Sequence, residues 1–273
     1  MQKNSWRLII SSPSSGSWNM AVDEAILKEV VSKNVPPTLR LYSWHPYCLS
    51  IGHAQSISKV NTKFLIKKGW EMVRRPTGGR AILHADELTY SINAPIDDPH
   101  VQGGVIESYR HLSHCLLRAL EFIGIKTDSK PKVEEEKYLS KNPVCFQYPS
   151  DYEITFQGKK LIGSAQARKI NGLLQHGAIP LFGDISRIIS ALNYKTDEEK
   201  IRAKRNLLMR ATTLQAIKRH MISWKELVNA IVHSFEETLN IHFIYSSLSP
   251  NELNRAKTLQ KEKYANEAWT FRI

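Results

Sequence analysis

Cysteine is scarce in this chain of 273 residues, which contains three, Cys48, Cys115 and Cys145. They are widely spaced, odd in number and form no Cys-x-x-Cys pair, which excludes a disulfide framework and argues against a cysteine-rich zinc site. Each is therefore interpreted as a single thiol. No other metal-ligand cluster is visible in the sequence, so we predict a protein without a bound metal.

Long apolar runs are also missing, because no stretch reaches the ~18 residues that a membrane-spanning helix needs. Near the N-terminus the apolar run at 8–10 ends at Ser11-Ser12-Pro13, which is too short for a secretory signal. We therefore expect a cytoplasmic protein with no membrane partner. With 42% hydrophobic and 23% charged residues, the composition is that of a globular protein, which excludes collagen-like and wholly disordered chains.

Acidic residues are outnumbered: 26 Asp and Glu stand against 38 Lys and Arg, for a formal net charge of +12. Such an excess attracts anionic partners. A nucleic-acid-binding module is one alternative, motivated by the basic residues Lys200, Arg202, Lys204, Arg205 and Arg210. No zinc-finger spacing, RNA-recognition signature or other nucleic-acid-reading motif accompanies them, so we expect no nucleic-acid partner.

Hydrophobic periodicity predicts an α+β protein. Helices are expected at 17–32, from 105 to Gly124 and through most of the chain after 182, where Ser223 with Glu226 and Ser249-Pro250 with Glu252 are candidate capping boxes. Strands are expected as two short segments within 38–53, at 70–75, around 88–92, as a hairpin at 151–167 and as a strand pair at 172–182. There is no internal repeat and no Gly/Ser linker, so residues 1–273 are predicted to form a single domain.

The residues at 74–80 read Arg-Arg-Pro-Thr-Gly-Gly-Arg and are followed by His84. The paired Gly78 and Gly79 let backbone N–H groups approach a ligand closely, and a flanking arginine such as Arg75 favours an anionic group. A phosphate-binding P-loop is excluded, because no Gly-Lys-Ser/Thr follows at the required spacing. A simple turn with no ligand remains the alternative.

Cys145 differs from the other two cysteines because it lies outside any apolar pattern, in a loop before a predicted strand, where nucleophiles are often presented. Cys48 and Cys115 fall in a strand and beside a helical core stripe, so we expect them to be buried. Lys159 and Lys160 sit at the turn of the predicted hairpin, where lysines are usually solvated. A lysine near a thiol would instead lower the pKa of the thiol and favour the thiolate.

Several short motifs occur together in a fixed order: Asn-Met-Ala at 19–21, Asp-Glu-Ala at 23–25, RRPTGGRAILH at 74–84, ELTYS at 87–91, VCF at 144–146, GKKLIGSAQ at 158–166 and QHG at 175–177. This combination resembles the lipoate/biotin protein ligase superfamily over nearly the whole chain, and within it the cysteine-dependent octanoyltransferases. The resemblance implies an α+β catalytic domain related to class II aminoacyl-tRNA synthetases, with a mixed, mainly antiparallel sheet and flanking helices.

The resemblance also implies roles for individual residues. Cys145 matches the nucleophile that forms an acyl thioester, and Lys160 matches the lysine that activates it. The matched substrate-binding residues are Arg75, Gly78, Gly79 and His84 of the acyl-pocket segment, Gly163, Ser164 and Ala165 of the adjoining wall, and His176 of the QHG segment, which is also a candidate base. The chain departs from the family where Arg80 replaces a third glycine and where Ala85, not Asp, follows the histidine, so that the acid is shifted to Asp86.

The activity implied is octanoyl transfer from octanoyl-acyl carrier protein to a lysine of a lipoyl-accepting protein, either the glycine cleavage H protein or a lipoyl domain. A carrier-bound thioester is already activated, so neither ATP nor another cofactor is expected. An ATP-dependent lipoate-protein ligase and an amidotransferase acting between two lipoyl proteins are the alternatives. Lipoate ligases often carry a C-terminal accessory domain, which we do not expect here because the sequence ends where the family's catalytic domain ends.

Overall fold

Two β-sheets form the framework of the protein, as seen in a computed structural model that describes residues 4–128, 154–169 and 171–273. Seven strands form the large sheet in the order β10-β1-β2-β6-β9-β8-β7, and three form the small sheet in the order β4-β3-β5. The strands are β1 Asn4–Ile10, β2 Thr38–Tyr42, β3 Cys48–Ile51, β4 Glu71–Arg74, β5 Ile82–His84, β6 Glu87–Pro95, β7 Ile154–Phe156, β8 Lys159–Lys169, β9 Gly172–Pro180 and β10 Ile241–Tyr245.

The large sheet is mixed, as predicted. Strand β1 runs parallel to both of its neighbours, β10 and β2. The remaining neighbours, from β2 through β6, β9 and β8 to β7, pair antiparallel. In the small sheet β3 pairs parallel with β4 and antiparallel with β5. The α+β class with a mainly antiparallel large sheet is therefore confirmed.

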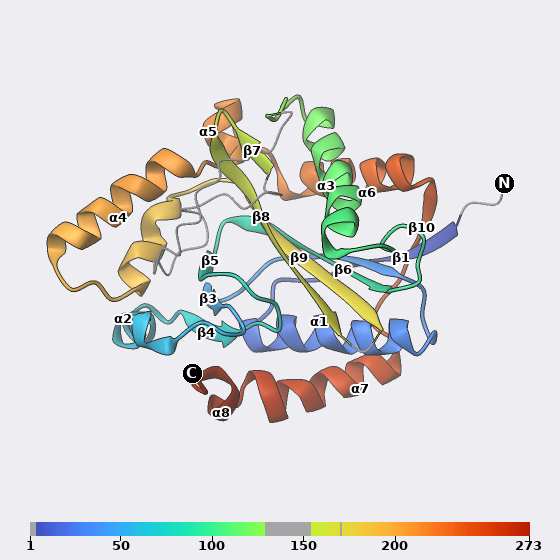
Figure 1. Cartoon of the computed structure of the whole chain (residues 1–273), viewed down its shortest axis with the longest axis horizontal. Coiled ribbons are helices and arrows are strands. Elements are labelled where there is room, and N and C mark those ends of the chain that lie inside the picture. Colours follow the sequence, from blue (N-terminus) through green and yellow to red (C-terminus); the bar gives the residue numbers. More distant parts are fainter. Residues whose placement is uncertain (1–3, 129–153, 170) are drawn as a thin grey trace.

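Helices cover both faces of the large sheet (Figure 1), with α1 and α7 packed together below it and α3 and α6 packed together above it. The helices are α1 Gly16–Val31, α2 Thr62–Lys68, α3 Val105–Phe122, α4 Asp197–Arg210, α5 Leu214–Lys218, α6 Trp224–Leu239, α7 Pro250–Leu259 and α8 Glu267–Thr270. None of the helices in the described ranges combines the length and the apolar character that a membrane crossing requires.

The ends of several helices follow from local sequence. The Ser249 side chain caps α7 by accepting from the backbone N–H of Glu252, whose carboxylate accepts from the backbone N–H of Ser249, which confirms the predicted capping box. Ser223 caps α6 by accepting from the backbone N–H of Glu226.

One local prediction is wrong: residues 172–182 contain the single strand β9 instead of a strand pair. Its partner is β8, which continues to Lys169, beyond the predicted end of the hairpin at 167. The two strands pair antiparallel from Gly163 opposite Ala178 to Lys169 opposite Gly172, so the alternation after residue 172 belongs to one long strand. Strands β1, β5 and β10 were not predicted either; the pairing of β10 with β1 joins segments from opposite ends of the chain.

Candidate functional site

A pocket with an empty volume of about 420 Å³ lies where α1, the strands β6, β8 and β9 and the small sheet meet. Its lining residues come from these elements and from the segment between β4 and β5: Met20, Tyr42, Trp44, Ser50, Arg75, Gly79, Ile82, His84, Thr89, Gly163, Ser164, Ala165, His176, Gly177 and Ala178. Seven of the ten site residues expected from the sequence are among them.

Arg75 shapes the glycine-rich segment from inside. Its guanidinium donates to the backbone carbonyls of Gly78 and Arg80, both at 2.8 Å from Nη2, and from Nη1 to the carbonyl and hydroxyl of Ser50, both at 3.2 Å. Nε donates to Gly78 as well. Five contacts match the five N–H donors of an arginine. Arg75 is therefore placed in the pocket wall as expected, with its charge directed at backbone carbonyls.

The two glycines of this segment have different positions. Gly79 lines the pocket with a backbone φ of +90°, in the left-handed region that favours glycine, and a Cβ there would lie 2.9 Å from the Arg75 guanidinium. Gly78 is not a lining residue, and its contribution is the carbonyl that accepts from Arg75. Gly79 is therefore the position of the pair at which the turn around the arginine side chain requires a glycine.

His84 is held on three sides. Its Nε2 lies 2.8 Å from the Ser50 hydroxyl and its Nδ1 lies 2.5 Å from the Glu87 carboxylate. The imidazole stacks on the Trp44 indole, with ring centroids 3.9 Å apart and planes 12° apart. The Thr89 hydroxyl links the same groups, because it donates to Glu87 at 2.6 Å and accepts from Trp44 Nε1 at 2.7 Å. This closed set fixes both the histidine and the tryptophan that line the pocket.

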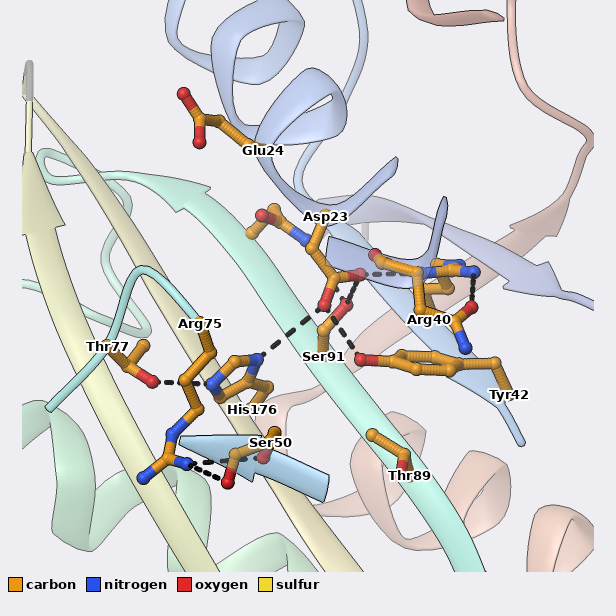
Figure 2. A network of polar contacts seen from close by, with 12 residues as sticks. Asp23, Glu24, Arg40, Tyr42, Ser50, Arg75, Thr77, Thr89, Ser91 and His176 are labelled. Carbon is orange, nitrogen blue, oxygen red and sulfur yellow. Dashed lines mark hydrogen bonds and ion pairs between the residues drawn. The ribbon is translucent and has the colours of Figure 1, made fainter. Parts of the chain in front are cut away.

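A buried carboxylate, Asp23 of α1, organises the opposite wall (Figure 2). Its Oδ1 accepts from Arg40 Nη1 and from the Ser91 hydroxyl, both at 2.8 Å, and its Oδ2 accepts from the Tyr42 hydroxyl at 2.8 Å. Burial by itself raises the pKa of Asp23. The positive charge of Arg40 and the contacts with His176 lower the pKa by more than burial raises it, so the pKa of Asp23 lies below its ordinary value. The carboxylate is therefore ionised, while Glu24 next to it points away from the network.

His176 joins this carboxylate to the glycine-rich segment. Its Nδ1 lies 3.6 Å from Asp23 Oδ2, and its Nε2 lies 2.6 Å from the Thr77 hydroxyl. Burial lowers the pKa of His176, against the opposing effect of Asp23, so the imidazole is neutral at neutral pH. Since the carboxylate favours the proton on Nδ1, Nε2 accepts from Thr77. Polar contacts from Asp23 to His176 and from His176 to Thr77 thus connect α1 to the segment that carries Gly79.

The third wall is the hairpin of β8 and β9. The Ser164 hydroxyl lies 2.6 Å from the Tyr90 hydroxyl of β6. Gly177 pairs with Ser164 across the hairpin, and a Cβ at position 177 would lie 2.6 Å from the Tyr90 ring and 2.7 Å from Ser164 Oγ. A glycine is needed here because the tyrosine and the serine already occupy the space of a side chain.

Most polar side-chain atoms of the pocket form hydrogen bonds with other polar atoms of the protein. In the part of the chain that the structure describes, none of the buried side-chain nitrogens and oxygens that lack a hydrogen-bond partner belongs to a lining residue. The same pocket has an apolar wall built from Met20, Trp44, Ile82 and Ala178. A pocket of this kind suits an apolar ligand, because a polar one would find few unsatisfied partners.

Of the two residues expected to carry the chemistry, the structure describes one, Lys160. Cys145 lies outside the described residues. Lys160 stands at the beginning of β8 and is only 1% exposed, so the expectation of a solvated lysine holds for Lys159 and is wrong for Lys160. Lys160 does not line the pocket, but Gly163, which does, follows three residues later on the same strand, about 10 Å along it.

Cys48 and Cys115 are buried, as expected. Burial raises the pKa of the Cys48 thiol well above its ordinary value, with Glu71 and Glu87 adding to the effect, and raises that of Cys115 to about 12. Neither thiol is a nucleophile at neutral pH. Asp86, the shifted acid, pairs with Arg187 and accepts from the Tyr47 hydroxyl at 2.9 Å, outside the pocket.

The sequence analysis assigned no role to the polar residues that support the pocket. The missed residues are Asn19, Asp23, Arg40, Tyr42, Trp44, Ser50, Thr77, Glu87, Thr89 and Ser91. A signal was present in β6, where polar residues at 87, 89, 91 and 93 alternate with apolar ones inside a strand that is buried along nearly its whole length. Such alternation between two covering helix layers indicates a buried polar face.

The chain is similar to a known protein family and to individual proteins over most of its length. Residues 15–236 match the family described as the lipoyl protein ligase A/B catalytic domain. The octanoyltransferase LipM of Carboxydothermus hydrogenoformans is 39% identical over 269 residues, covering 98% of this chain and 99% of that protein. The octanoyltransferase LipM of Bacillus subtilis is 37% identical over 277 residues and is matched from end to end.

Solved structures show the same fold. A bipartite lipoate protein ligase from Thermoplasma acidophilum superposes with a TM-score of 0.82 at 22% identity, over 98% of this chain and 96% of that one. A lipoate-protein ligase A bound with ATP gives a TM-score of 0.80 at 22% identity, over 99% of both chains. The protein therefore has the lipoate protein ligase fold.

Proposed function

The chain belongs to the lipoyl protein ligase A/B catalytic-domain family, and from this premise we propose that it is an octanoyltransferase of protein lipoylation. The observation in the structure that carries the proposal is the pocket in which Arg75, Gly79, His84, Gly163, Ser164, Ala165 and His176 come together. Its polar groups are bonded to one another and its remaining wall is apolar, which suits an unbranched acyl chain.

The donor in this proposal is octanoyl-acyl carrier protein, and the acceptor is a lysine of a lipoyl domain or of the glycine cleavage H protein. Both partners are expected to be acidic, and a formal charge of +12 accelerates encounter with acidic proteins through long-range attraction. The choice of the carrier over a lipoyl protein as donor rests on the resemblance of the QHG segment to the carrier-dependent transferases; in the structure, His176 of this segment lines the pocket.

The reaction proceeds in two acyl transfers. The Cys145 thiolate attacks the octanoyl carbonyl carbon, the bond to the carrier sulfur breaks, and the carrier leaves as a thiol after taking up a proton. The acceptor lysine, as the neutral amine, then attacks the Cys145 thioester, forms the amide and releases the Cys145 thiol. Thioester exchange is nearly balanced in free energy and amide formation is favourable, so this sequence consumes no ATP.

Lys160 is proposed to stabilise the Cys145 thiolate. Its ammonium group is withdrawn from solvent, which strengthens its electrostatic effect on a neighbouring anion. Strand β8 carries Lys160 at its start and the pocket wall at Gly163–Ala165, so one strand connects the proposed activating group with the acyl site.

Intact-mass spectrometry after incubation with octanoyl-acyl carrier protein, without ATP or Mg²⁺, tests the function. Wild-type protein should gain the mass of one octanoyl group, and Cys145→Ser should gain none. Cys115→Ala, which removes a buried thiol, is the matched control and should load like wild type. If loading requires ATP, or if Cys145→Ser still forms a thioester, the proposal is wrong and the ligase alternative is favoured.

The proposed role of Lys160 has a separate test in the pH dependence of Cys145 alkylation. Lys160→Met removes the positive charge with little change in volume, so the apparent pKa of the thiol should rise. The control is Lys159→Met at the adjacent exposed position, which should leave the curve unchanged. Identical curves for wild type and Lys160→Met would refute the activation while leaving Cys145 as nucleophile.

A further inference from the structure

Helix α4 turns an unusual face to solvent. Counted from Ile201, residues follow at helical spacings of three, four, seven and eight, so all five share one side of the helix. They are Ile201, Lys204, Arg205, Leu208 and Met209. The inward side is made by Ala203 and Leu207, which are buried. We call the five solvent-facing residues the α4 face.

The apolar members of the α4 face are well exposed: Ile201 by 61%, Leu208 by 43% and Met209 by 56%. Single exposed apolar residues are common on protein surfaces, but three on one face between two cations form a continuous patch. These five side chains and Lys159 of the β7–β8 turn line a shallow groove. The groove therefore combines apolar walls with positive charge.

The α4 face adjoins the proposed catalytic strand. Lys159 donates from Nζ to the carbonyl of Leu208 at 3.4 Å, at the end of α4. Directly after the helix, Ala211 pairs with Lys160, and the backbone N–H of Thr212 donates to the Lys160 carbonyl at 3.0 Å. In Figure 1, α4 lies beside the end of the sheet, away from the α1 and α3 layers. The face thus lies where β8, and with it Lys160, begins.

Helix electrostatics explains only part of this composition. Acidic residues occupy the first turn of α4 and Arg210 the last, as expected for a helix dipole. The dipole gives no reason for Ile201, Leu208 and Met209 to face water. Nucleic acid would pair with the cations but would leave these apolar side chains without suitable partners. An acidic protein surface with apolar residues of its own complements both properties.

We propose that the α4 face is the docking surface for the acidic acyl carrier protein that donates the octanoyl group, an inference that rests on the proposed function. A donor has to deliver its acyl chain to the pocket, and β8 leads from the α4 face to the pocket wall at Gly163–Ala165. An acceptor has only to bring its lysine to the Cys145 thioester. Two of the five cations that motivated a nucleic-acid partner in the sequence, Lys204 and Arg205, therefore belong to a protein-docking face.

The test separates docking from chemistry by using two donors for the same Cys145 acylation. Octanoyl-acyl carrier protein presents a protein surface, whereas octanoyl-pantetheine presents only the thioester. The charge variant is Lys204→Glu with Arg205→Glu, and the apolar variant is Ile201→Ser with Leu208→Ser. The matched controls lie on α2, where Lys63→Glu with Lys67→Glu and Ile66→Ser alter exposed residues of the same types.

We expect each α4 variant to lower kcat/KM for acylation by the carrier protein by about tenfold or more, and to leave acylation by octanoyl-pantetheine within about twofold of wild type. Transfer from pre-acylated enzyme to the acceptor protein should be unchanged. The α2 controls should behave like wild type with both donors.

Each other outcome overturns the docking proposal. Carrier-dependent rates equal to wild type mean that the donor docks elsewhere, and a defect confined to the second half-reaction assigns the face to the acceptor. Equal defects with both donors indicate damage to the site itself. Loss of DNA binding with normal acylation assigns the cations to nucleic acid. If wild-type protein is acylated by neither donor, the proposed function itself fails, which is distinguishable from a failure of docking alone.

Discussion

The two faces of strand β6 differ completely in chemistry although both are buried. One face carries Leu88, Tyr90, Ile92 and Ala94, which join the core beneath α3 and α6. The other carries Glu87, Thr89, Ser91 and Asn93, on the side covered by α1. Tyr90 connects the two, because its ring is part of the core and its hydroxyl meets Ser164.

This difference separates stability from positioning. The apolar face is stabilised by removal of surface from water, which is non-directional and tolerates small adjustments. The polar face depends on hydrogen bonds of fixed geometry, each of which orients a group of the pocket. Damage to the first should lower stability alone, and damage to the second should also change the site.

The largest effect is expected from Asp23→Ala. It leaves the Arg40 guanidinium buried without its carboxylate and removes the acceptor of Tyr42 and Ser91, so the free energy of unfolding should fall by about 3–5 kcal/mol. Urea denaturation measures this loss. Asp23→Asn keeps the shape and should lose less. A loss below about 1 kcal/mol for Asp23→Ala would mean that the network contributes little.

Leu116→Ala tests the apolar side. Leu116 of α3 is 1% exposed, so truncation should lower the free energy of unfolding by about 2–5 kcal/mol through lost burial and a residual cavity. The rate of Cys145 acylation per folded molecule should stay within about twofold of wild type. Ile66→Ala at an exposed position serves as control, with almost no loss of stability expected. A large fall in the acylation rate would show that the two faces are not separable.

Thr77→Val removes the hydroxyl that His176 Nε2 accepts from and should lower the free energy of unfolding by about 1–3 kcal/mol. Because Thr77 belongs to the segment that carries Gly79, the acylation rate should fall as well. Thr77→Ser keeps the hydroxyl and should restore most of the rate. Equal rates for the valine and serine variants would exclude a positioning role for this hydrogen bond.

The smallest effect concerns pH. Burial lowers the pKa of His176 below its ordinary value of 6.5, so the unfolded chain binds the proton first as the pH falls. The free energy of unfolding should therefore decrease as the pH drops from 6.5 towards the lower pKa of the folded protein. In His176→Gln this dependence should be weaker in urea titrations at several pH values. His220→Gln, at an exposed position, should retain the wild-type slope.

Local patterns predicted much of the framework. Apolar periodicity located α1, α3 and α6, and alternation located β2, β3, β4, β6 and the β7–β8 hairpin. These patterns succeed because neighbouring residues on one face of a helix or strand share one environment. They missed β1, β5 and β10 and misread β9, because the partners of these strands are decided by pairing distant segments.

For the candidate site, too, the sequence predicted some features and missed others. Motif resemblance selected seven residues that line one pocket, including Arg75, His84 and His176. It gave no indication that Asp23 on the first helix would face His176, because 153 residues separate them in the sequence. The place of Lys160 at a predicted hairpin turn is typical of a solvated lysine, yet the structure buries this residue and pairs its backbone with Ala211 and Thr212.

By itself, the sequence determined the secondary structure with strong periodicity, the excess of positive charge and the residue types that suit acyl transfer. Only the tertiary structure decided which polar residues are buried together, how Asp23, His176 and Thr77 connect α1 to the pocket, and that Lys204 and Arg205 of α4 line a groove with exposed apolar residues. The reason is physical. Periodicity reports the average environment along one element, whereas a carboxylate, an imidazole and a hydroxyl interact only at distances set by the packing of separate elements.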